Sequence, residues 1–173
     1  MRVLVSDLLD MTQTRLGGSL RIEREQANLA LICQEATDEM WTVHPDRTFE
    51  LDLSGDLSGT WVPARLSQIL ANLLQNAVQH GAQGRPVTLS LHEERDRVVL
   101  SIHDEGAAIS ESARLRIFEL LIRGEGGTAS RQSSSLGLGL YIAREIARAH
   151  GGSIDVKSSE NEGTCFTVCL PRR

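Results

Sequence analysis

Two asparagines lie on the polar face of a helix that the sequence predicts over residues 63–80. Asn72 and Asn76 are four residues apart, which places both amides on one side of that helix. The same face carries Gln68, Gln79 and His80. Amide oxygens can ligate Mg²⁺, and amide nitrogens can donate hydrogen bonds to phosphate. A polar face that only contacts water is the alternative interpretation.

A carboxylate follows a predicted strand in the segment Asp104-Glu105-Gly106. The preceding residues 98–102 alternate between apolar and polar types, so Asp104 stands where the chain leaves a sheet. Gly106 frees the backbone to turn at that point. A buried Asp104 could accept a hydrogen bond from an exocyclic amine. Taken alone, the segment is equally well explained as a turn with an aspartate.

Glycines open a later predicted helix in the sequence Ser135-Leu136-Gly137-Leu138-Gly139-Leu140. Glycines at a helix N-terminus let bare N–H groups approach phosphate oxygens, and the helix dipole favours the anion. The segment does not follow a strand, so it lacks the context of a dinucleotide-binding fingerprint. Before it, residues 119–135 are predicted to form a long loop of the kind that often serves as a lid. That loop carries Arg123 and Arg131, either of which could meet a phosphate.

The three cysteines do not form a metal-binding pattern. Their odd number and irregular spacing indicate a reducing compartment. Cys165 and Cys169 would share one face of a strand, but no histidine or second thiol pair accompanies them. We therefore interpret Cys33, Cys165 and Cys169 as small core residues.

A mixture of helices and strands must position these groups. The helical periodicity is strongest over residues 63–80, and Gly81 ends that helix. Asn28 is a candidate N-cap for an earlier helix. Other helices are predicted over residues 2–15, 28–40, 110–119 and 137–149. Strands are predicted near residues 20–22, 49–53, 87–91, 98–102, 153–158 and 164–170, with loops at 54–60 and 93–97. The order predicts an α+β layered domain.

Composition narrows the possible functions. The 173 residues carry 18 Lys+Arg and 23 Asp+Glu, a formal net charge of −5, and only 3 % of them are aromatic. This balance argues against a general nucleic-acid binder and against a base-stacking surface. No apolar run is long enough to span a membrane. The first fifteen residues mix charged and apolar types, unlike a secretion signal. One domain of ordinary size is expected.

The order and spacing of these groups resemble the ATP-binding catalytic domain of bacterial sensor histidine kinases. That family belongs to the GHKL superfamily, the wider group that contains the gyrase, Hsp90 and MutL ATPase domains. The resemblance covers roughly residues 20–171. The segments that carry it are LSQILANLLQNAVQHG, DEGAAI, IFELLIRG and LGLGLYIAREIARAHGGSIDVKSSENEGTCFTVCLP.

The resemblance implies a role for each matching residue. Asn76 resembles the asparagine that ligates Mg²⁺, and Asn72 the one nearer the phosphates. Asp104, with Gly106 beside it, resembles the aspartate that binds the adenine amino group.

Further residues match the phosphate and lid motifs of the family. Gly137 and Gly139 resemble the glycines that receive the phosphates. Phe118 and Arg123 fall in the phenylalanine motif that opens the lid. The other residues expected to bind ATP are Gln79, His80, Ala108, Ile109, Arg131, Leu136, Leu138 and Leu140.

Several positions depart from the family pattern. Glycine is usual at Ala108 and Ser135, phenylalanine at Leu121, lysine at Gln79, and an acidic residue at Val62, whose helix then lacks a side-chain cap. Gln79 removes a cation from the phosphate side. One charge-assisted contact is worth on the order of 1–3 kcal/mol, so we expect ATP affinity to drop about tenfold or more.

The resemblance also implies a fold and an organisation. The expected fold is a two-layer α/β sandwich, in which a mixed, mostly antiparallel sheet packs on three helices and ATP lies between the helices and a lid. Residues 1–18 resemble the end of the second helix of a dimerisation and histidine-phosphotransfer domain, and residues 19–173 the catalytic domain. The expected partners are that dimerisation domain and a response regulator, and the expected location is the cytoplasm.

The implied activity is to bind Mg-ATP and donate the γ-phosphate to a histidine outside this chain, as part of a two-component system. None of the five histidines is expected to be the acceptor, so the chain alone should not autophosphorylate. They are His44, His80, His92, His103 and His150. An ATP hydrolase is a second interpretation, but such enzymes carry a glutamate where this chain has Asn72, which cannot act as a base. A degenerate binding or scaffold module is a third, motivated by the departures.

Overall fold

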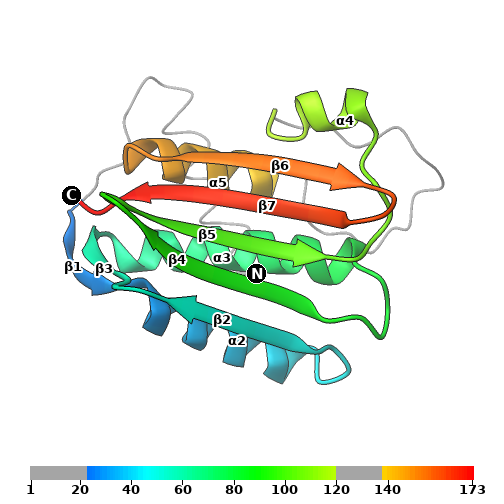
Figure 1. Ribbon diagram of the computed structural model, residues 1–173, viewed down its shortest axis with the longest axis horizontal. Coiled ribbons are helices and arrows are strands. Elements are labelled where there is room, and N and C mark those ends of the chain that lie inside the picture. The colour runs from blue at the N-terminus through cyan, green and yellow to red at the C-terminus, as the bar shows by residue number, and fades with distance from the viewer. Residues whose placement is uncertain (1–22, 120–137) are drawn as a thin grey trace.

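A mixed five-stranded sheet dominates the computed structural model, which describes residues 23–119 and 138–173 (Figure 1). The strands follow the order β2-β4-β5-β7-β6. β2 runs parallel to β4, and every other pair is antiparallel. Their bounds are Phe49–Ser54 for β2, Val87–Glu94 for β4, Arg97–Asp104 for β5, Ser153–Ser159 for β6 and Gly163–Pro171 for β7.

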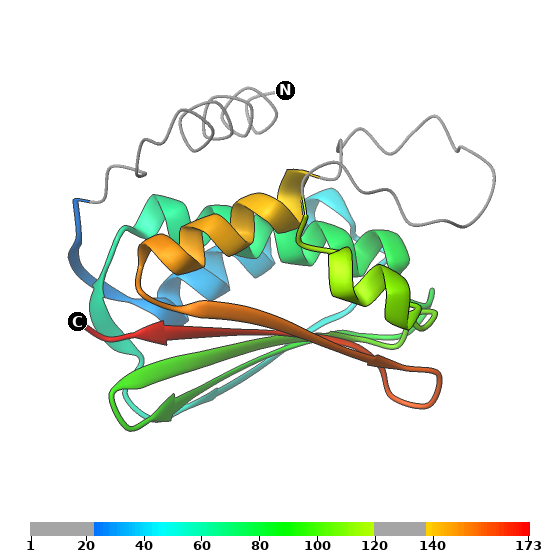
Figure 2. The same cartoon turned by 90° about the horizontal axis from the view of Figure 1, so that it is seen from above.

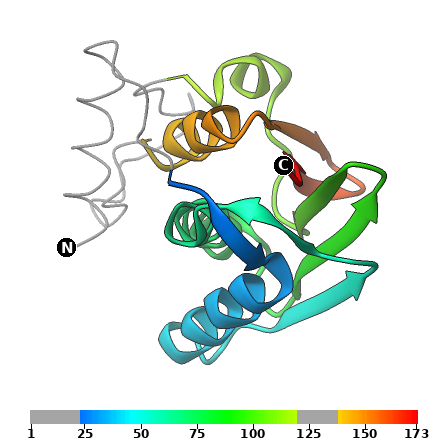
Figure 3. The same ribbon diagram turned by 90° about the vertical axis from the view of Figure 1, so that its left-hand side faces the viewer.

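Three helices cover one face of this sheet (Figures 2 and 3). They are α2 (Leu29–Val43), α3 (Pro63–His80) and α5 (Leu138–Ala149). The short helix α4 (Glu111–Arg116) lies at the β6 edge of the sandwich (Figure 1). The predicted two-layer α+β fold is confirmed, and within the described ranges the helix bounds differ from the predicted ones by a few residues at most.

The strand periodicity divides the sheet into an inner and an outer face. Leu89, Ile102, Phe166 and Val156 are in register across β4, β5, β7 and β6, and all four are buried beneath the helices. The neighbouring row on the outer face consists of Ser90, Ser101, Thr167 and Asp155. A sheet with one solvated face gives this alternation, and it fixes which side chains can line a site under the helices.

A second, two-stranded sheet corrects the prediction of a loop over residues 54–60. Its strands β1 (Glu25–Asn28) and β3 (Ser58–Trp61) pair antiparallel, from Glu25 opposite Trp61 to Asn28 opposite Ser58. Glycine and serine made this segment look like a loop. Gly59 serves instead as a close contact, because a Cβ there would overlap the buried indole ring of Trp61. The strand predicted at 20–22 and the helix at 2–15 lie outside the described residues.

The prediction that the cysteines are core residues is right for one of the three. Cys33 is buried in the core on α2, and burial raises the pKa of its thiol to about 12. Cys165 and Cys169 are partly exposed on the outer face of β7, so the prediction that they are core residues is wrong. The pattern put them together on one face, as expected. The pattern did not show that Phe166 and Val168 occupy the inner face of β7, so that the two thiols must lie on the outer face.

No helix in residues 23–119 or 138–173 is long and apolar enough to cross a membrane.

The helix starts differ in how they are capped. The Asn28 side chain accepts a hydrogen bond of 2.9 Å from the Ala30 backbone N–H, which confirms the predicted N-cap of α2. Val62 makes no side-chain cap bond at the start of α3, as expected. Its backbone N–H donates instead to Nε2 of His150, at 3.2 Å. His150 is 1 % exposed, and its Nδ1 lies 2.8 Å from the Ile146 carbonyl oxygen. This histidine therefore joins the end of α5 to the start of α3.

The free energy of unfolding should fall on acidification because of His150. Its Nε2 must be unprotonated to accept from Val62, and burial lowers its pKa below the ordinary value, with the charges of Arg24 and Arg65 adding to the effect. As pH falls below about 6.5, the unfolded chain takes up a proton that the folded chain resists. Stability is thus fully present above that pH and is lost toward the lower, folded-state pKa.

Urea unfolding at pH 7.5 and pH 5.5 tests this prediction. The His150→Gln variant should lose part of the difference between the two pH values, by at most about 1.4 kcal/mol per pH unit for one proton. His92→Gln, which removes an exposed imidazole on the outer face, is the matched control and should keep the difference. An unchanged pH dependence in His150→Gln would contradict the assignment.

Candidate functional site

Asp104 is the centre of the site. It ends β5 with only 2 % of its surface exposed, and its Oδ1 accepts a hydrogen bond of 2.9 Å from the Gly106 N–H. Its other oxygen has no hydrogen-bond partner among residues 23–119 and 138–173. Two glycines pack closely against Asp104. A Cβ on Gly106 would lie 2.7 Å from the Asp104 Oδ1, and a Cβ on Gly163 would overlap the Asp104 carbonyl oxygen. The buried carboxylate predicted from the sequence is therefore present.

The electrostatics of Asp104 reflect two opposing effects. Burial raises the pKa of the carboxyl group above its ordinary value. The Gly106 N–H and the positive fields of His103, His80 and Arg47 act in the opposite direction. A buried carboxylate that accepts one backbone hydrogen bond keeps further lone pairs and is a strong acceptor for an N–H donor.

A hydroxyl pair missed by the sequence interpretation lies next to Asp104. Thr164 on β7 is directly opposite Asp104 in the sheet and is 3 % exposed. Its Oγ1 is 2.8 Å from the Ser158 Oγ, which in turn accepts a 2.9 Å hydrogen bond from the Ile109 N–H. The two hydroxyls thus tie the chain that follows Gly106 to β6 and β7. The sequence signal for this pair was that Thr164 shares the inner face of β7 with the apolar residues Phe166, Val168 and Leu170.

Asn72 faces the start of α5. A Cβ on Gly139 would lie 3.2 Å from the Asn72 Oδ1, so helices α3 and α5 approach closely here. The Asn72 Nδ2 is buried and has no hydrogen-bond partner in the described parts of the chain. Buried donors are rarely left unpaired, so this amide is poised for an acceptor that a ligand would bring. Gly139 and Leu140 are half-buried, whereas Leu138 is a core residue.

The rest of the polar face of α3 runs from Asn72 toward Asp104. Asn76 is half-buried one turn further along, and Gln79 and His80 are exposed at the end of the helix. A Cβ on Gly106 would overlap the His80 carbonyl oxygen. The end of α3 and the turn after Asp104 are thus in direct contact, and the asparagine face and the carboxylate belong to one region.

The remaining predicted residues fall into two groups. Phe118 is half-buried, and its ring meets that of Phe166 edge to face, with centroids 6.2 Å apart and planes at 80°. Ile109 packs on the core, and Ala108 is exposed. The others lie outside the described residues, so the structure does not place them. They are Arg123, Arg131, Leu136 and Gly137.

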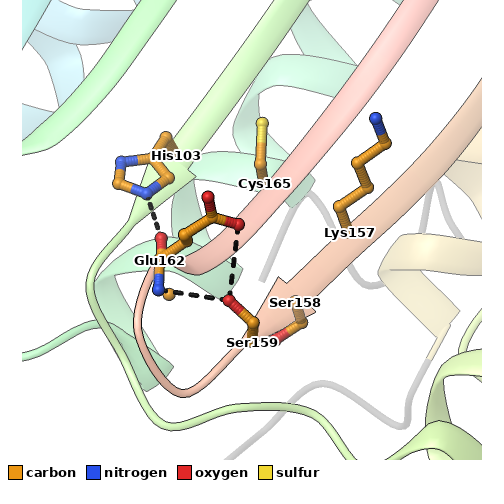
Figure 4. A pocket seen from close by; sticks show the side chains of 7 residues that line it. His103, Lys157, Ser158, Ser159, Glu162 and Cys165 are labelled. Carbon is orange, nitrogen blue, oxygen red and sulfur yellow. Dashed lines mark hydrogen bonds between the residues drawn. The ribbon is translucent and has the colours of Figure 1, made fainter.

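A separate hollow lies on the outer face of the sheet (Figure 4). The residues around it are His103, Lys157, Ser158, Ser159, Glu162, Gly163 and Cys165. His103 Nε2 is 2.5 Å from the Glu162 carbonyl oxygen, which anchors the β6–β7 turn to β5. His103 and Asp104 are on opposite faces of the sheet, so the hollow opens on the other side from the buried carboxylate, although Ser158 and Gly163 border both. No group of three or more His, Cys, Asp or Glu side chains that could hold a metal occurs in the part of the chain described.

Comparison with known proteins identifies the family. Residues 61–173 match the family described as "Histidine kinase-, DNA gyrase B-, and HSP90-like ATPase", and the chain belongs to this family. It is 34 % identical over 173 residues to a bacteriophytochrome of Pseudomonas aeruginosa, covering all of this chain and 24 % of the relative. It is 36 % identical over 171 residues to the probable sensor histidine kinase TcrY of Mycobacterium tuberculosis, covering 97 % and 35 %.

A solved structure gives the same result for the fold. The chain superposes on full-length ShkA in complex with AMPPNP with a TM-score of 0.79 and 26 % identity, covering 97 % of this chain and 35 % of that one. The predicted resemblance to histidine kinase catalytic domains is confirmed. The chain spans about a quarter to a third of the length of these proteins.

Proposed function

We propose that this chain is the catalytic and ATP-binding domain of a sensor histidine kinase. In this proposal it binds Mg-ATP and presents the γ-phosphate to a histidine on a dimerisation domain, which then passes the phosphoryl group to a response regulator. The observation that carries the proposal is the buried Asp104 carboxylate beside the end of a helix whose Asn72 Nδ2 is buried and lacks a partner in the described residues. Two of the relatives' names support it, one a sensor histidine kinase and one solved with an ATP analogue.

Each group has a role that its position supports. Asp104 accepts from the amino group of adenine, and Thr164 and Ser158 hold the backbone around it. The Asn72 Nδ2 donates to a phosphate oxygen, and the N–H groups of the first turn of α5 face the same anion, which the helix dipole favours. Phosphoryl transfer depends mainly on such positioning and charge neutralisation. The exposed Gln79 offers no cation there, so the amides carry more of the binding.

Magnesium fits the donor set that α3 offers. Asn76 would supply a neutral amide oxygen, a ligand type that Mg²⁺ accepts, with phosphate oxygens and water as its other ligands. Bound there, the ion would neutralise charge on the phosphates.

The organisation of the longer protein is part of the proposal. Residues 1–18, which lie outside the described part, are assigned to the end of the second helix of the dimerisation and phosphotransfer domain, and residues 19–173 to the catalytic domain. This assignment rests on the sequence resemblance and on relatives that are much longer than this chain. The domain is assigned to the cytoplasm on the same basis. In this organisation, the catalytic domain supplies the γ-phosphoryl group of ATP to an acceptor histidine of the dimerisation domain.

Mg-ADP should raise the stability of the chain. At a ligand concentration of 100 times Kd, the free energy of unfolding should rise by about 2.7 kcal/mol. Thermal unfolding with Mg-ADP, with Mg²⁺ alone and with ADP plus a chelator measures the gain and the share of the metal. The absence of any shift would favour a scaffold module. Steady phosphate release from ATP by this chain alone would favour a hydrolase instead.

A further inference from the structure

Arg47 is a buried cation that does not belong to any of the motifs identified in the sequence. It precedes β2 by two positions and is 6 % exposed. Its Nη1 donates to the carbonyl oxygen of Ala82 at 2.7 Å, and its Nη2 to that of Val78 at 3.1 Å. Longer bonds of 3.3 Å run from Nη2 to the carbonyl oxygens of Ala77 and Gly81. One guanidinium group thus contacts several carbonyl groups at the end of α3 and just beyond it.

These carbonyl groups need such a partner. The last turn of a helix leaves its carbonyl oxygens without partners inside the helix, and the dipole makes that end negative. At the end of α3 the backbone supplies a bond from the Gly81 N–H to the Ala77 oxygen, at 2.8 Å. Arg47 completes the cap with a planar donor group that a lysine could not reproduce. It therefore fixes the end of α3 to the segment that enters β2.

The same end of α3 borders Asp104. A Cβ placed on Gly81 would lie 3.0 Å from the Arg47 Nη2 and 3.1 Å from the Asp104 Cβ, so the guanidinium group and the carboxylate side chain flank one glycine. The last residue of α3 also touches Gly106, because a Cβ on this glycine would overlap the His80 carbonyl oxygen. A shift of the end of α3 would therefore move Gly81 and His80, which pack against Asp104 and Gly106.

The charge of Arg47 also faces the site. No carboxylate in residues 23–119 or 138–173 forms an ion pair with it, so its field is not cancelled by a direct partner. The groups whose charges act on Asp104 are, in decreasing order of effect, His103 on β5, His80 on α3 and Arg47 before β2. The field of Arg47 opposes the effect of burial, which by itself favours the protonated carboxyl.

We propose that Arg47 is a positioning residue of the base site, which caps α3 and adds a positive charge on the side of Gly81 opposite the Asp104 side chain. The inference rests on the proposed function, because it assumes that Asp104 reads a purine. An ionised Asp104 accepts from a 6-amino group, whereas a protonated one could donate to a 6-oxo group. Arg47 would therefore set both the affinity for adenine and its preference over hypoxanthine.

Binding of Mg-ADP and of Mg-IDP to the whole chain between pH 5.5 and pH 8 tests the proposal. In Arg47→Met, Mg-ADP should bind about tenfold more weakly, with a smaller loss for Mg-IDP. The pH at which half of the ADP affinity is lost should rise. Arg47→Lys should restore the pH profile, because it keeps the charge, but not the full affinity. Arg97→Met, which removes an exposed arginine of the β4–β5 hairpin, should match the wild type.

Each other outcome is informative. A folded Arg47→Met variant with wild-type affinity and pH profile overturns the inference. Equal losses for the two nucleotides with an unshifted pH profile also overturn it, since a purely structural cap would give that result. If Arg47→Met does not fold, Arg47→Gln gives the same comparison, because glutamine keeps a donor but no charge. A wild-type chain that fails to bind Mg-ADP would contradict the proposed function itself.

Discussion

Replacing Asp104 with asparagine should remove measurable stabilisation by Mg-ADP while leaving the fold intact. The substitution keeps an oxygen that can accept from the Gly106 N–H. It turns the other acceptor into an NH₂ group that would face the amino group of adenine, donor against donor. Losing a charge-assisted hydrogen bond and burying an unmatched donor should weaken binding about 100-fold or more, roughly 3 kcal/mol.

The unliganded variant should melt no lower than the wild type. Burial raises the pKa of Asp104, which means that the ionised carboxylate lowers the stability of the folded state at neutral pH. Removing the charge therefore removes that penalty. For the same reason, Mg-ADP affinity in the wild type should decline on acidification at a higher pH than an ordinary aspartate would give, because the carboxylate is the form that accepts.

Calorimetric titration of Mg-ADP, together with melting curves of the free proteins, checks both statements. Glu105→Gln is the matched control. It removes a neighbouring carboxylate that pairs with Arg85 at 3.0 Å on the surface, and it should bind Mg-ADP like the wild type. Equal affinities for Asp104→Asn and the wild type would contradict the assignment of Asp104 to the base.

The layers and the centre of the site could be predicted from the sequence, because local patterns determine them. Alternation over residues 98–102 predicted a strand with Asp104 where the chain leaves the sheet, and in the structure Ile102 and Asp104 are both buried. The four-residue spacing put Asn72 and Asn76 on one face of α3. The family resemblance added the roles of these residues, which neither spacing nor composition could supply.

The contacts that support the site could not be predicted in the same way. Arg47 and His150 bind backbone groups of Ala82 and Val62, which are 35 and 88 residues away in the chain. An arginine or histidine in a turn carries no local sign of such a contact. Thr164 matters because the register of β5 and β7 places it opposite Asp104. The strand β3 was missed because Gly59 was interpreted as a loop residue, whereas a glycine is needed there to leave room for the Trp61 ring.

Replacing Phe166 with alanine should cause a large loss of stability, whatever nucleotide is present. Phe166 is fully buried at the centre of β7, with Ile102 and Val156 as its neighbours in the sheet. Truncating a buried phenylalanine removes its transfer free energy and leaves a cavity, which costs about 3–5 kcal/mol. Because a domain of this size has only about 5–15 kcal/mol of net stability, much of it would be lost.

Urea unfolding of Phe166→Ala measures the expected loss of stability. A double-mutant cycle with Phe118→Ala also shows whether the Phe166 ring holds Phe118 in place. Phe166→Leu keeps most of the volume and should lose less than about 1.5 kcal/mol. Phe118→Ala combined with Phe166→Ala should reveal a coupling of about 0.5–1.5 kcal/mol for the edge-to-face pair. A loss in Phe166→Ala no larger than in Phe166→Leu would contradict the central role of this ring. A coupling measured without nucleotide would show that the core, rather than a ligand, orders Phe118, the residue at which the family's lid motif begins.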